Sequence, residues 1–460
     1  MTLFRSLFPG LLAVLLPGAA LAQTPSQFGC SLLENASVAA IEGSDGVFYR
    51  IQSDLRLQHP MDDIIVQRLA ELSRVLAEGG TTLIYANVPT KGQAMPAYLP
   101  PDAVDYGYDK TMMEANYLDV VTRLNAAGVP APDLMTAMKS APEGEQVFFR
   151  ADFHWTPEGA RLAAKAIGET IRALPAYSDV TPVTFKTREV GKAIAFSGLR
   201  RELQGFCLNA MPMAEATTFE TARSTEGPVN DASDIFADGG ETAAPTDTGG
   251  TVDIFGTGAA EATLALVGTS FSDSEINNFS GFLSEYSGIE VVNYAITGGN
   301  QFGSITSYLT SPEFAAERPT FLVWENPIYN SLAQFGSTPL DELIIAAGPP
   351  CDIPVGAKPS GPQTLRAGFE AGSLKANDAL LFDLGTIGAR RVTVTLETAT
   401  GIKRTVRIER GERLRATGRF YLRLTPYWLP DLTRVAVEFD RPLGDQSTIM
   451  LCPPSKGDAS

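Results

Sequence analysis

The chain has 460 residues, of which 44% are hydrophobic, so it can bury a sizeable core, and its length predicts two domains. This composition excludes a fibrous or wholly disordered protein. The net charge of −17 is spread unevenly: residues 351–460 hold 16 Lys and Arg against 12 Asp and Glu, a balance of +4, which leaves −21 for residues 1–350. We expect no nucleic acid among the partners of so acidic a chain.

The first 22 residues have the features of a signal peptide. Arg5 supplies positive charge, residues 11–16 form a short apolar core, and Ala20-Leu21-Ala22 is the small-x-small pattern that a signal peptidase cuts. The apolar run is shorter than the ~20 residues that a spanning helix needs, which argues against a membrane anchor. We therefore expect export to the periplasm, with cleavage near Ala22 and Gln23.

Residues 23–349 are expected to form one domain. Apolar residues recur at helical spacing in some segments and run continuously through short segments elsewhere. Helices are predicted at 64–77, 111–127, from 157 onward, 279–286 and 305–309, and strands or extended segments at 82–86, 147–149, 263–267, 291–295 and 321–324. Continuous apolar strands that alternate with helices indicate a parallel sheet covered on both faces. The predicted fold class is therefore α/β.

Two stretches depart from this α/β pattern. Residues 211–255 are rich in Ala, Thr, Glu, Asp and Gly and poor in large apolar residues, which predicts an acidic, mobile insertion without chemistry of its own. Residues 350–460 contain segments in which apolar and polar residues alternate, at 391–397, 405–408, 419–424 and 434–439. Short alternating strands separated by turns predict a C-terminal antiparallel β-sandwich.

The four cysteines are expected to form two disulfides, because an exported chain meets an oxidising compartment. Four cysteines allow three connectivities. The pairs Cys30–Cys207 and Cys351–Cys452 are favoured because each brackets one proposed domain. A zinc site is not expected, since the chain has no C-x-x-C spacing and only two histidines. No cofactor is required by the chemistry described below.

Of the two histidines, His154 has the better setting for catalysis. It follows Asp152 by two positions, directly before a predicted helix. In an extended segment such residues point the same way, so the carboxylate can fix the imidazole tautomer and stabilise the imidazolium. A structural Asp-x-His pair without catalytic role is the alternative.

Ser270 is the predicted nucleophile. It lies in Gly268-Thr269-Ser270 between an apolar strand and a predicted helix, and α/β proteins place their sites at the carboxyl ends of parallel strands. Its backbone N–H would join a helix N-terminus, where a developing oxyanion is favoured. Ser272 is the alternative nucleophile. The N–H of Gly298 and the side-chain amide of Asn326, which follow the next two strands, are further oxyanion candidates.

The order strand-Gly-Thr-Ser, strand-Asn-(x)4-Gly, strand-x-Asn resembles the SGNH (GDSL-type) hydrolases. This sequence departs from them in having Asp-x-His before the serine instead of Asp-x-x-His after it. That combination is similar to the periplasmic alginate O-acetyltransferases of the AlgX/AlgJ family, as are residues 43–49 (GSDGVFY), residues 88–92 (VPTKG) and the trailing β domain. The resemblance implies an SGNH-like fold, a catalytic set of Asp152, His154 and Ser270, and a C-terminal carbohydrate-binding module.

The resemblance also implies an activity, which is transfer of an acetyl group to hydroxyls of alginate or a similar exopolysaccharide through an acetylated serine. Two alternatives remain open: a secreted polysaccharide acetyl esterase, and a non-catalytic polysaccharide-binding subunit of an export complex. The implied partners are an anionic polysaccharide and other periplasmic or membrane proteins of exopolysaccharide acetylation and export.

A basic stretch at 403–423 is the predicted place for that polysaccharide, because Lys and Arg suit a chain of carboxylates. Lys403, Arg404, Arg407 and Arg413 are the residues expected to bind it. A solvated strand face without a partner is the alternative.

Overall fold

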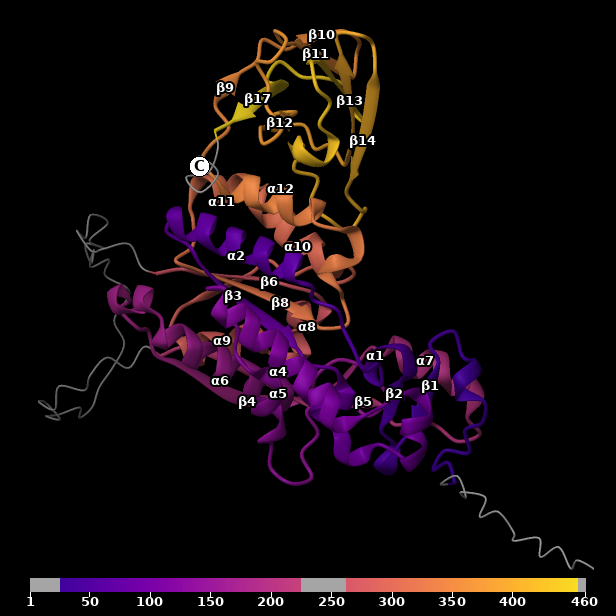
Figure 1. The fold of residues 1–460 in the computed structure, drawn as a ribbon. Coiled ribbons are helices and arrows are strands. Elements are labelled where there is room, and N and C mark those ends of the chain that lie inside the picture. The colour runs from indigo at the N-terminus through magenta and orange to yellow at the C-terminus, as the bar shows by residue number, and fades with distance from the viewer. Residues whose placement is uncertain (1–24, 225–261, 454–460) are drawn as a thin grey trace, which may run out of the picture.

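The computed structural model describes residues 25–224 and 262–453 (Figure 1). The predicted signal peptide and most of the predicted acidic insertion lie outside these residues. No helix in the described part of the chain combines the length and the apolar content that crossing a bilayer needs. The described residues form an α/β region followed by a C-terminal region of antiparallel strands, as predicted.

The α/β region is built on a parallel sheet of four strands in the order β3-β8-β6-β7. The strands are β3 (Thr82–Val88), β8 (Phe321–Pro327), β6 (Leu264–Val267) and β7 (Val291–Asn293). Every residue of β6 and β8 is buried, which explains why β6 and residues 321–324 of β8 are continuously apolar in sequence. The predicted parallel sheet is confirmed.

Helices cover both faces of this sheet, as Figure 1 shows. One face carries α2 (Asp63–Glu78), α10 (Asn300–Leu309) and α12 (Thr338–Ala347), and the other carries α5 (Leu134–Lys139), α6 (Pro157–Ala173) and α9 (Phe279–Ser287). Successive side chains of β3 point to opposite faces of the sheet: Leu83 and Tyr85 pack on the α2 side, and Ile84 packs on the α6 side. Shorter or peripheral helices are α1 (Ile51–Asp54), α3 (Lys91–Ala94), α4 (Lys110–Ala126), α7 (Gly198–Leu203), α8 (Ser270–Asp273) and α11 (Pro312–Ala316).

Two antiparallel hairpins are added to the α/β region. The shorter one pairs β1 (Ala40–Glu42) with β2 (Phe48–Arg50), and the longer one pairs β4 (Phe185–Ala195) with β5 (Ala214–Arg223). The sequence prediction of an irregular insertion from residue 211 is therefore wrong for β5. Much of β4 is exposed, so few large apolar residues mark the hairpin in the sequence, and backbone pairing holds it instead.

The C-terminal region consists of two antiparallel sheets that enclose a core of their own. One sheet has the order β10-β11-β16-β13-β14, with strands Lys358–Pro359, Thr364–Gly368, Leu432–Phe439, Arg391–Thr398 and Lys403–Glu409. The other has the order β15-β12-β17-β9, with strands Arg419–Arg423, Ala379–Asp383, Thr448–Cys452 and Ile353–Pro354. The predicted alternating segments all fall in β13 to β16.

The smaller of these sheets also packs against the α/β region. In β12, Leu380 and Phe382 point into the sandwich, whereas Ala379 and Leu381 point the opposite way and join the core formed with α2 and α12. Tyr421 of β15 lies on the same outer face and is buried. One face of the sheet therefore closes the sandwich, and the other docks onto α12 (Figure 1).

Both predicted disulfides are present. Cys30 is bonded to Cys207, which ties the N-terminal segment to the residues after α7. Cys351 is bonded to Cys452, which joins the start of the C-terminal region to the end of β17.

Candidate active site

Asp152, His154 and Ser270 are connected by hydrogen bonds, although Ser270 lies 116 residues beyond His154 in the chain. His154 Nδ1 is 2.6 Å from Asp152 Oδ1, and His154 Nε2 is 2.7 Å from Ser270 Oγ. With Nδ1–H donating to the carboxylate, Nε2 is left to accept the hydroxyl proton of Ser270. Asp152 is buried, while His154 and Ser270 are partly exposed to solvent.

The segment that carries Asp152 and His154 is a tight turn, and not the extended segment that we expected. Phe148 forms an antiparallel bridge with Trp155, and the N–H of Phe149 donates to the carbonyl of His154. Asp152 Oδ1 also accepts the backbone N–H of His154 at 2.9 Å. The side chains of Asp152 and His154 meet because the carboxylate folds back onto the turn, as Asp side chains often do. Alternation along a strand is not the cause.

A buried lysine fixes the start of this turn. Lys91 in α3 is fully buried, and its Nζ donates to the carbonyls of Phe48 (2.8 Å), Phe149 (2.7 Å) and Arg150 (3.1 Å). Burial lowers the pKa of Lys91 to about 8. Lys91 thus joins β2 to the backbone that leads into Asp152. The sequence of residues 88–92 did not predict this role for Lys91.

The surroundings of the pair favour an ionised Asp152. Burial alone would raise the pKa of Asp152, but the hydrogen bonds from the ring and the backbone N–H of His154 lower it below its ordinary value. The His154 ring packs between Phe153 and Phe271, with centroids 4.2 and 4.9 Å away. The guanidinium of Arg50 covers Phe153, 4.5 Å from the ring centroid. The imidazole is therefore held by rings as well as by the carboxylate.

The two serines after β6 differ in where their hydroxyls point. Ser270 is the first residue of α8, and its hydroxyl faces His154. Ser272 is buried, and its hydroxyl donates to Glu325 Oε2 at 2.9 Å. The geometry favours Ser270 over Ser272 as the nucleophile.

The structure contradicts the assignment of Asn326 to an oxyanion site. Asn326 is buried, and its Nδ2 donates to Tyr85 Oη and to the carbonyl of Asn330, both at 3.0 Å. Because side chains alternate along β8, Asn326 points to the α2 side of the sheet, whereas Glu325 points to the side of the Ser270 turn. Both donors of the Asn326 amide are therefore used away from Ser270.

Gly298 lies next to the turn that carries Ser270. It lies between β7 and α10 with φ of 77°, which favours glycine. The neighbouring N–H of Ile296 donates to the carbonyl of Gly268, and the N–H of Thr297 donates to Asp273 Oδ2 at 2.9 Å. These bonds place the Gly298 loop beside the turn that carries Ser270.

The chain is similar to known proteins over most of its α/β region. Residues 40–328 match the family model described as "SGNH hydrolase-like domain, acetyltransferase AlgX". The chain belongs to this family. Alginate biosynthesis protein AlgX of Pseudomonas aeruginosa is 30% identical over 296 residues, which cover 64% of this chain and 56% of that protein. Probable alginate O-acetylase AlgJ of the same species is 28% identical over 287 residues, 60% of this chain and 67% of that protein.

The likeness of fold extends beyond the residues that the family model matches. The structure titled "Structural and functional characterization of Pseudomonas aeruginosa AlgX" superposes with a TM-score of 0.70 at 22% identity, covering 90% of this chain and 95% of that chain. The AlgX-like fold therefore includes C-terminal strands as well as the parallel sheet.

In this AlgX-family chain, six of the eight cations in the basic stretch form ion pairs within the protein, and two of these pairs, Lys403 with Glu397 and Arg407 with Glu409, are exposed. The other four are as follows. Arg410 pairs with Glu342 of α12, Arg415 with Glu313 of α11, Arg423 with Glu71 of α2, and Arg419 with Asp383 of its own sheet. Three of these pairs join the C-terminal region to the α/β region. The opposite charges of the two regions are therefore explained in part by their own interface.

The four predicted polymer-binding cations are exposed. Lys403, Arg404 and Arg407 lie on β14, an edge strand, where charged side chains also protect against pairing with another sheet. Arg407 contacts Glu409 at 2.8 Å. Arg413 instead reaches the α/β region: its Nη1 is 3.5 Å from the carbonyl of Thr297, and a Cβ on Gly298 would lie 3.0 Å from its Cδ. Arg413 is thus the predicted binding residue nearest to the Ser270 turn.

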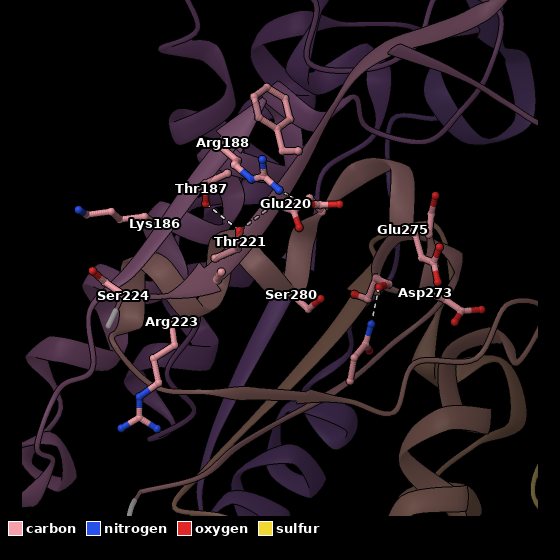
Figure 2. Close-up of a pocket in the computed structure, with 16 residues that line it drawn as sticks. Lys186, Thr187, Arg188, Glu220, Thr221, Arg223, Ser224, Asp273, Glu275 and Ser280 are labelled. Carbon is pink, nitrogen blue, oxygen red and sulfur yellow. Dashed lines mark hydrogen bonds and ion pairs between the residues drawn. The ribbon is translucent and has the colours of Figure 1, made fainter. Parts of the chain in front are cut away.

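A groove of about 800 Å³ also borders α8, the helix that begins at Ser270. Figure 2 shows the β4–β5 hairpin on one side, with Lys186, Arg188 and Arg223, and Asp273 and Glu275 on the other. Ser272 and Asp273 of α8 line it, but Ser270 and His154 do not. The groove carries charges of both signs and adjoins the site without containing it.

Arg50 is a second buried charge that the sequence analysis missed. It forms an ion pair with Asp54 at 3.0 Å, and its guanidinium lies between the rings of Phe153 and Tyr329. The hairpin sequence 43–49 therefore leads into a residue that supports the ring next to His154. The sequence signal for this ion pair is an Arg followed four positions later by an Asp.

Proposed function

We propose that the chain transfers an acetyl group to hydroxyls of alginate or a similar exopolysaccharide through an acetyl-enzyme on Ser270. The observation that carries the proposal is the hydrogen-bonded series Asp152–His154–Ser270 at 2.6 and 2.7 Å. Membership of the AlgX family and the similarity to proteins named for alginate biosynthesis and alginate O-acetylation support the choice of acyl group and polymer.

In the first half-reaction, His154 Nε2 takes the proton of Ser270 while Oγ attacks the carbonyl carbon of an acetyl donor. The ionised Asp152 stabilises the imidazolium. The backbone N–H groups of Ser270 and Gly298 receive the oxyanion, each worth roughly 2.7–4 kcal/mol in comparable sites. Collapse of the tetrahedral intermediate breaks the bond to the leaving group, which takes the proton from His154 and leaves Ser270 acetylated.

In the second half-reaction, a sugar hydroxyl replaces the donor. His154 takes its proton as the oxygen attacks the acetyl carbonyl, and the same imidazolium then returns a proton to Ser270 Oγ. The acetyl group ends on the sugar and the free serine is restored. If water enters instead of the sugar, the product is acetate, and the same residues act as an esterase.

The C-terminal region is proposed to hold the polymer while the α/β region transfers the acetyl group. The exposure of Lys403, Arg404 and Arg407 and the position of Arg413 beside Gly298 support this division. A chain of uronate carboxylates bound along these cations would pass from β14 toward the Ser270 turn. In this role the C-terminal sandwich is a carbohydrate-binding module, and the protein works in the periplasm with other proteins of polymer acetylation and export.

The test is an incubation of the protein with a soluble acetyl ester and oligomannuronate, followed by mass spectrometry of both protein and sugar. Wild type should gain an acetyl adduct on Ser270 and pass it to the oligomer. Ser270→Ala should do neither, whereas Ser272→Ala should still form the adduct at alkaline pH. Acetate release without acetylated oligomer would identify an esterase, and oligomer binding without any adduct would identify a non-catalytic subunit.

A further inference from the structure

A buried glutamate lies beneath the nucleophile turn and has no part in the mechanism above. Glu325 of β8 is fully buried. Its carboxylate accepts the backbone N–H of Thr269 at 2.8 Å, the hydroxyl of Thr269 at 3.1 Å and the hydroxyl of Ser272 at 2.9 Å. These two residues stand on either side of Ser270. The carboxylate is therefore bonded to the turn before and after the nucleophile.

The backbone is shaped to let Glu325 come this close. A Cβ at position 268 would lie 2.5 Å from Glu325 Oε2 and 2.9 Å from Ser272 Oγ, so only glycine fits there. Thr269 is the N-cap of α8, and its hydroxyl also accepts the N–H of Phe271. The whole turn from Gly268 to Ser272 is thus built around one carboxylate.

The charge of Glu325 is not balanced by these contacts, because its donors are neutral groups. The ionisable groups that its charge affects are Tyr85 of β3, on the other side of the sheet, and Tyr329 after β8. The pKa of each is raised, first by burial and then in part by Glu325. Burial raises the pKa of Glu325 to about 7, although the hydrogen bonds from Thr269 and Ser272 oppose this shift. The carboxyl group therefore changes its protonation near neutral pH.

We infer that Glu325 is a positioning residue whose ionised carboxylate holds the turn that carries Ser270 in the geometry needed to reach His154. The inference rests on the proposed function of Ser270 as the nucleophile. The ionised form accepts from all three donors and has no proton of its own to place. When the carboxyl group is protonated it must itself donate, so a hydroxyl of Thr269 or Ser272 has to turn away and the turn loses a contact.

The decisive experiment is a pH–rate profile of the full-length protein with a small acetyl ester, from about pH 5 to about pH 9. In wild type, the ionisation of Glu325 should contribute to the acid limb. In Glu325→Gln, kcat at alkaline pH should fall by about 10- to 100-fold with KM unchanged, because the nucleophile is misplaced. The acid limb should also lose one ionisation. An acid limb of unchanged slope and midpoint would overturn the inference.

A second variant tests the same point without replacing the carboxylate. Ser272→Ala removes one donor to the ionised form, so the pKa of Glu325 should rise further and the midpoint of the acid limb should move to higher pH. Glu290→Gln, an exposed glutamate before β7, is the matched control and should leave the profile unchanged. A midpoint in Ser272→Ala equal to that of wild type would count against the inference.

Covalent labelling separates this inference from the proposed function. The rate at which methanesulfonyl fluoride modifies Ser270, followed by intact mass, should show the same loss of an ionisation in Glu325→Gln. If wild type is labelled but passes no acetyl group to the oligomer or to water, the proposed function fails while the positioning role of Glu325 is still measured. If the labelling profiles of wild type and Glu325→Gln coincide, the positioning role fails.

Discussion

Arg410 and Glu342 form an ion pair across the boundary between the two regions, and their side chains are only 10% and 9% exposed. Glu342 also accepts the backbone N–H of Tyr421. Removing one member would leave the other charge buried without its partner, which costs more than the pair contributes.

We expect Arg410→Ala to lower the free energy of unfolding by about 3–5 kcal/mol, as for other broken buried pairs. Arg407→Ala, on the exposed edge strand, should stay within about 0.5 kcal/mol of wild type. Replacing both partners, Arg410→Met with Glu342→Leu, should recover most of the loss. Urea unfolding of the three variants measures this, and equal losses in the single and double variants would show that the pair is not what holds the interface.

The carboxylate beside His154 gives a second prediction. Asp152→Asn should lower kcat with a small acetyl ester by about 10⁴-fold, because the amide favours the wrong imidazole tautomer and does not stabilise the imidazolium. Asp179→Asn, an exposed aspartate after α6, should change kcat by less than about twofold, since surface substitutions act weakly. A thermal melt checks that both variants are folded. A kcat within tenfold of wild type in Asp152→Asn would remove Asp152 from the catalytic set.

The division of labour between the regions can be tested with charge variants. A triple variant should bind long uronate oligomers more weakly and hydrolyse a small ester almost as fast as wild type. It carries Ala at Arg404, Arg407 and Arg413. Added salt should have the same effect in wild type, because exposed charges are screened over about 8–10 Å at physiological ionic strength. Lys110, Arg188 and Lys192 are exposed cations of the α/β region, and their joint replacement is the control. Equal affinity of the two triple variants for the oligomers would show that the β14 surface is solvated and does not bind the polymer.

The disulfides should differ in what they stabilise. Serine at both Cys351 and Cys452 should destabilise the C-terminal strands by about 2–5 kcal/mol, a usual cost for small secreted domains. Amide hydrogen exchange should then quicken in β12 and β17 more than in the parallel sheet. Serine at Cys30 and Cys207 should instead affect the N-terminal segment and α7. Uniform acceleration across both regions in either variant would contradict this localisation.

The raised pKa of Glu325 predicts a gain of stability in a variant that loses activity. The ordinary pKa is 4.5 and the pKa in the folded protein is about 7, so the folded state holds the proton more tightly. The cost of burying the charge is absent below pH 4.5, grows as the pH rises toward 7 and is complete above it. The free energy of unfolding of Glu325→Gln, relative to that of wild type, should therefore increase by up to about 3 kcal/mol from acidic to alkaline pH. Urea unfolding at the two extremes checks this, and a difference that does not vary with pH would refute it.

The sequence predicted the parallel sheet and the Asp-His-Ser set for a definite reason. Buried strands are continuously apolar, and His154 stands out because the chain has only two histidines. The turn at Asp152 was not foreseen, because the same Asp-x-His spacing fits an extended segment and a tight turn. Asn326 was misassigned because a sequence shows that a residue ends a strand but not which face of the sheet it takes.

Buried charges were the largest omission. Lys91, Arg50 and Glu325 are all buried, yet charged residues are expected at the surface, so nothing in composition marks them. A signal did exist for Glu325, which directly follows the apolar run at 321–324 and precedes Asn326. The β4–β5 hairpin escaped notice because many of its residues alternate in charge and face solvent.

β12 belongs to two cores at once, since its alternate side chains enter the sandwich and the layer against α12. A fragment of residues 350–460 would contain the whole sandwich but would expose Leu381, Tyr421 and Met450 to solvent. Such a fragment should associate or precipitate unless these positions are made polar. The two regions are therefore not independent domains joined by a linker. A gene fusion that transferred the sandwich alone to another protein would need that protein to cover the apolar face that α12 covers here.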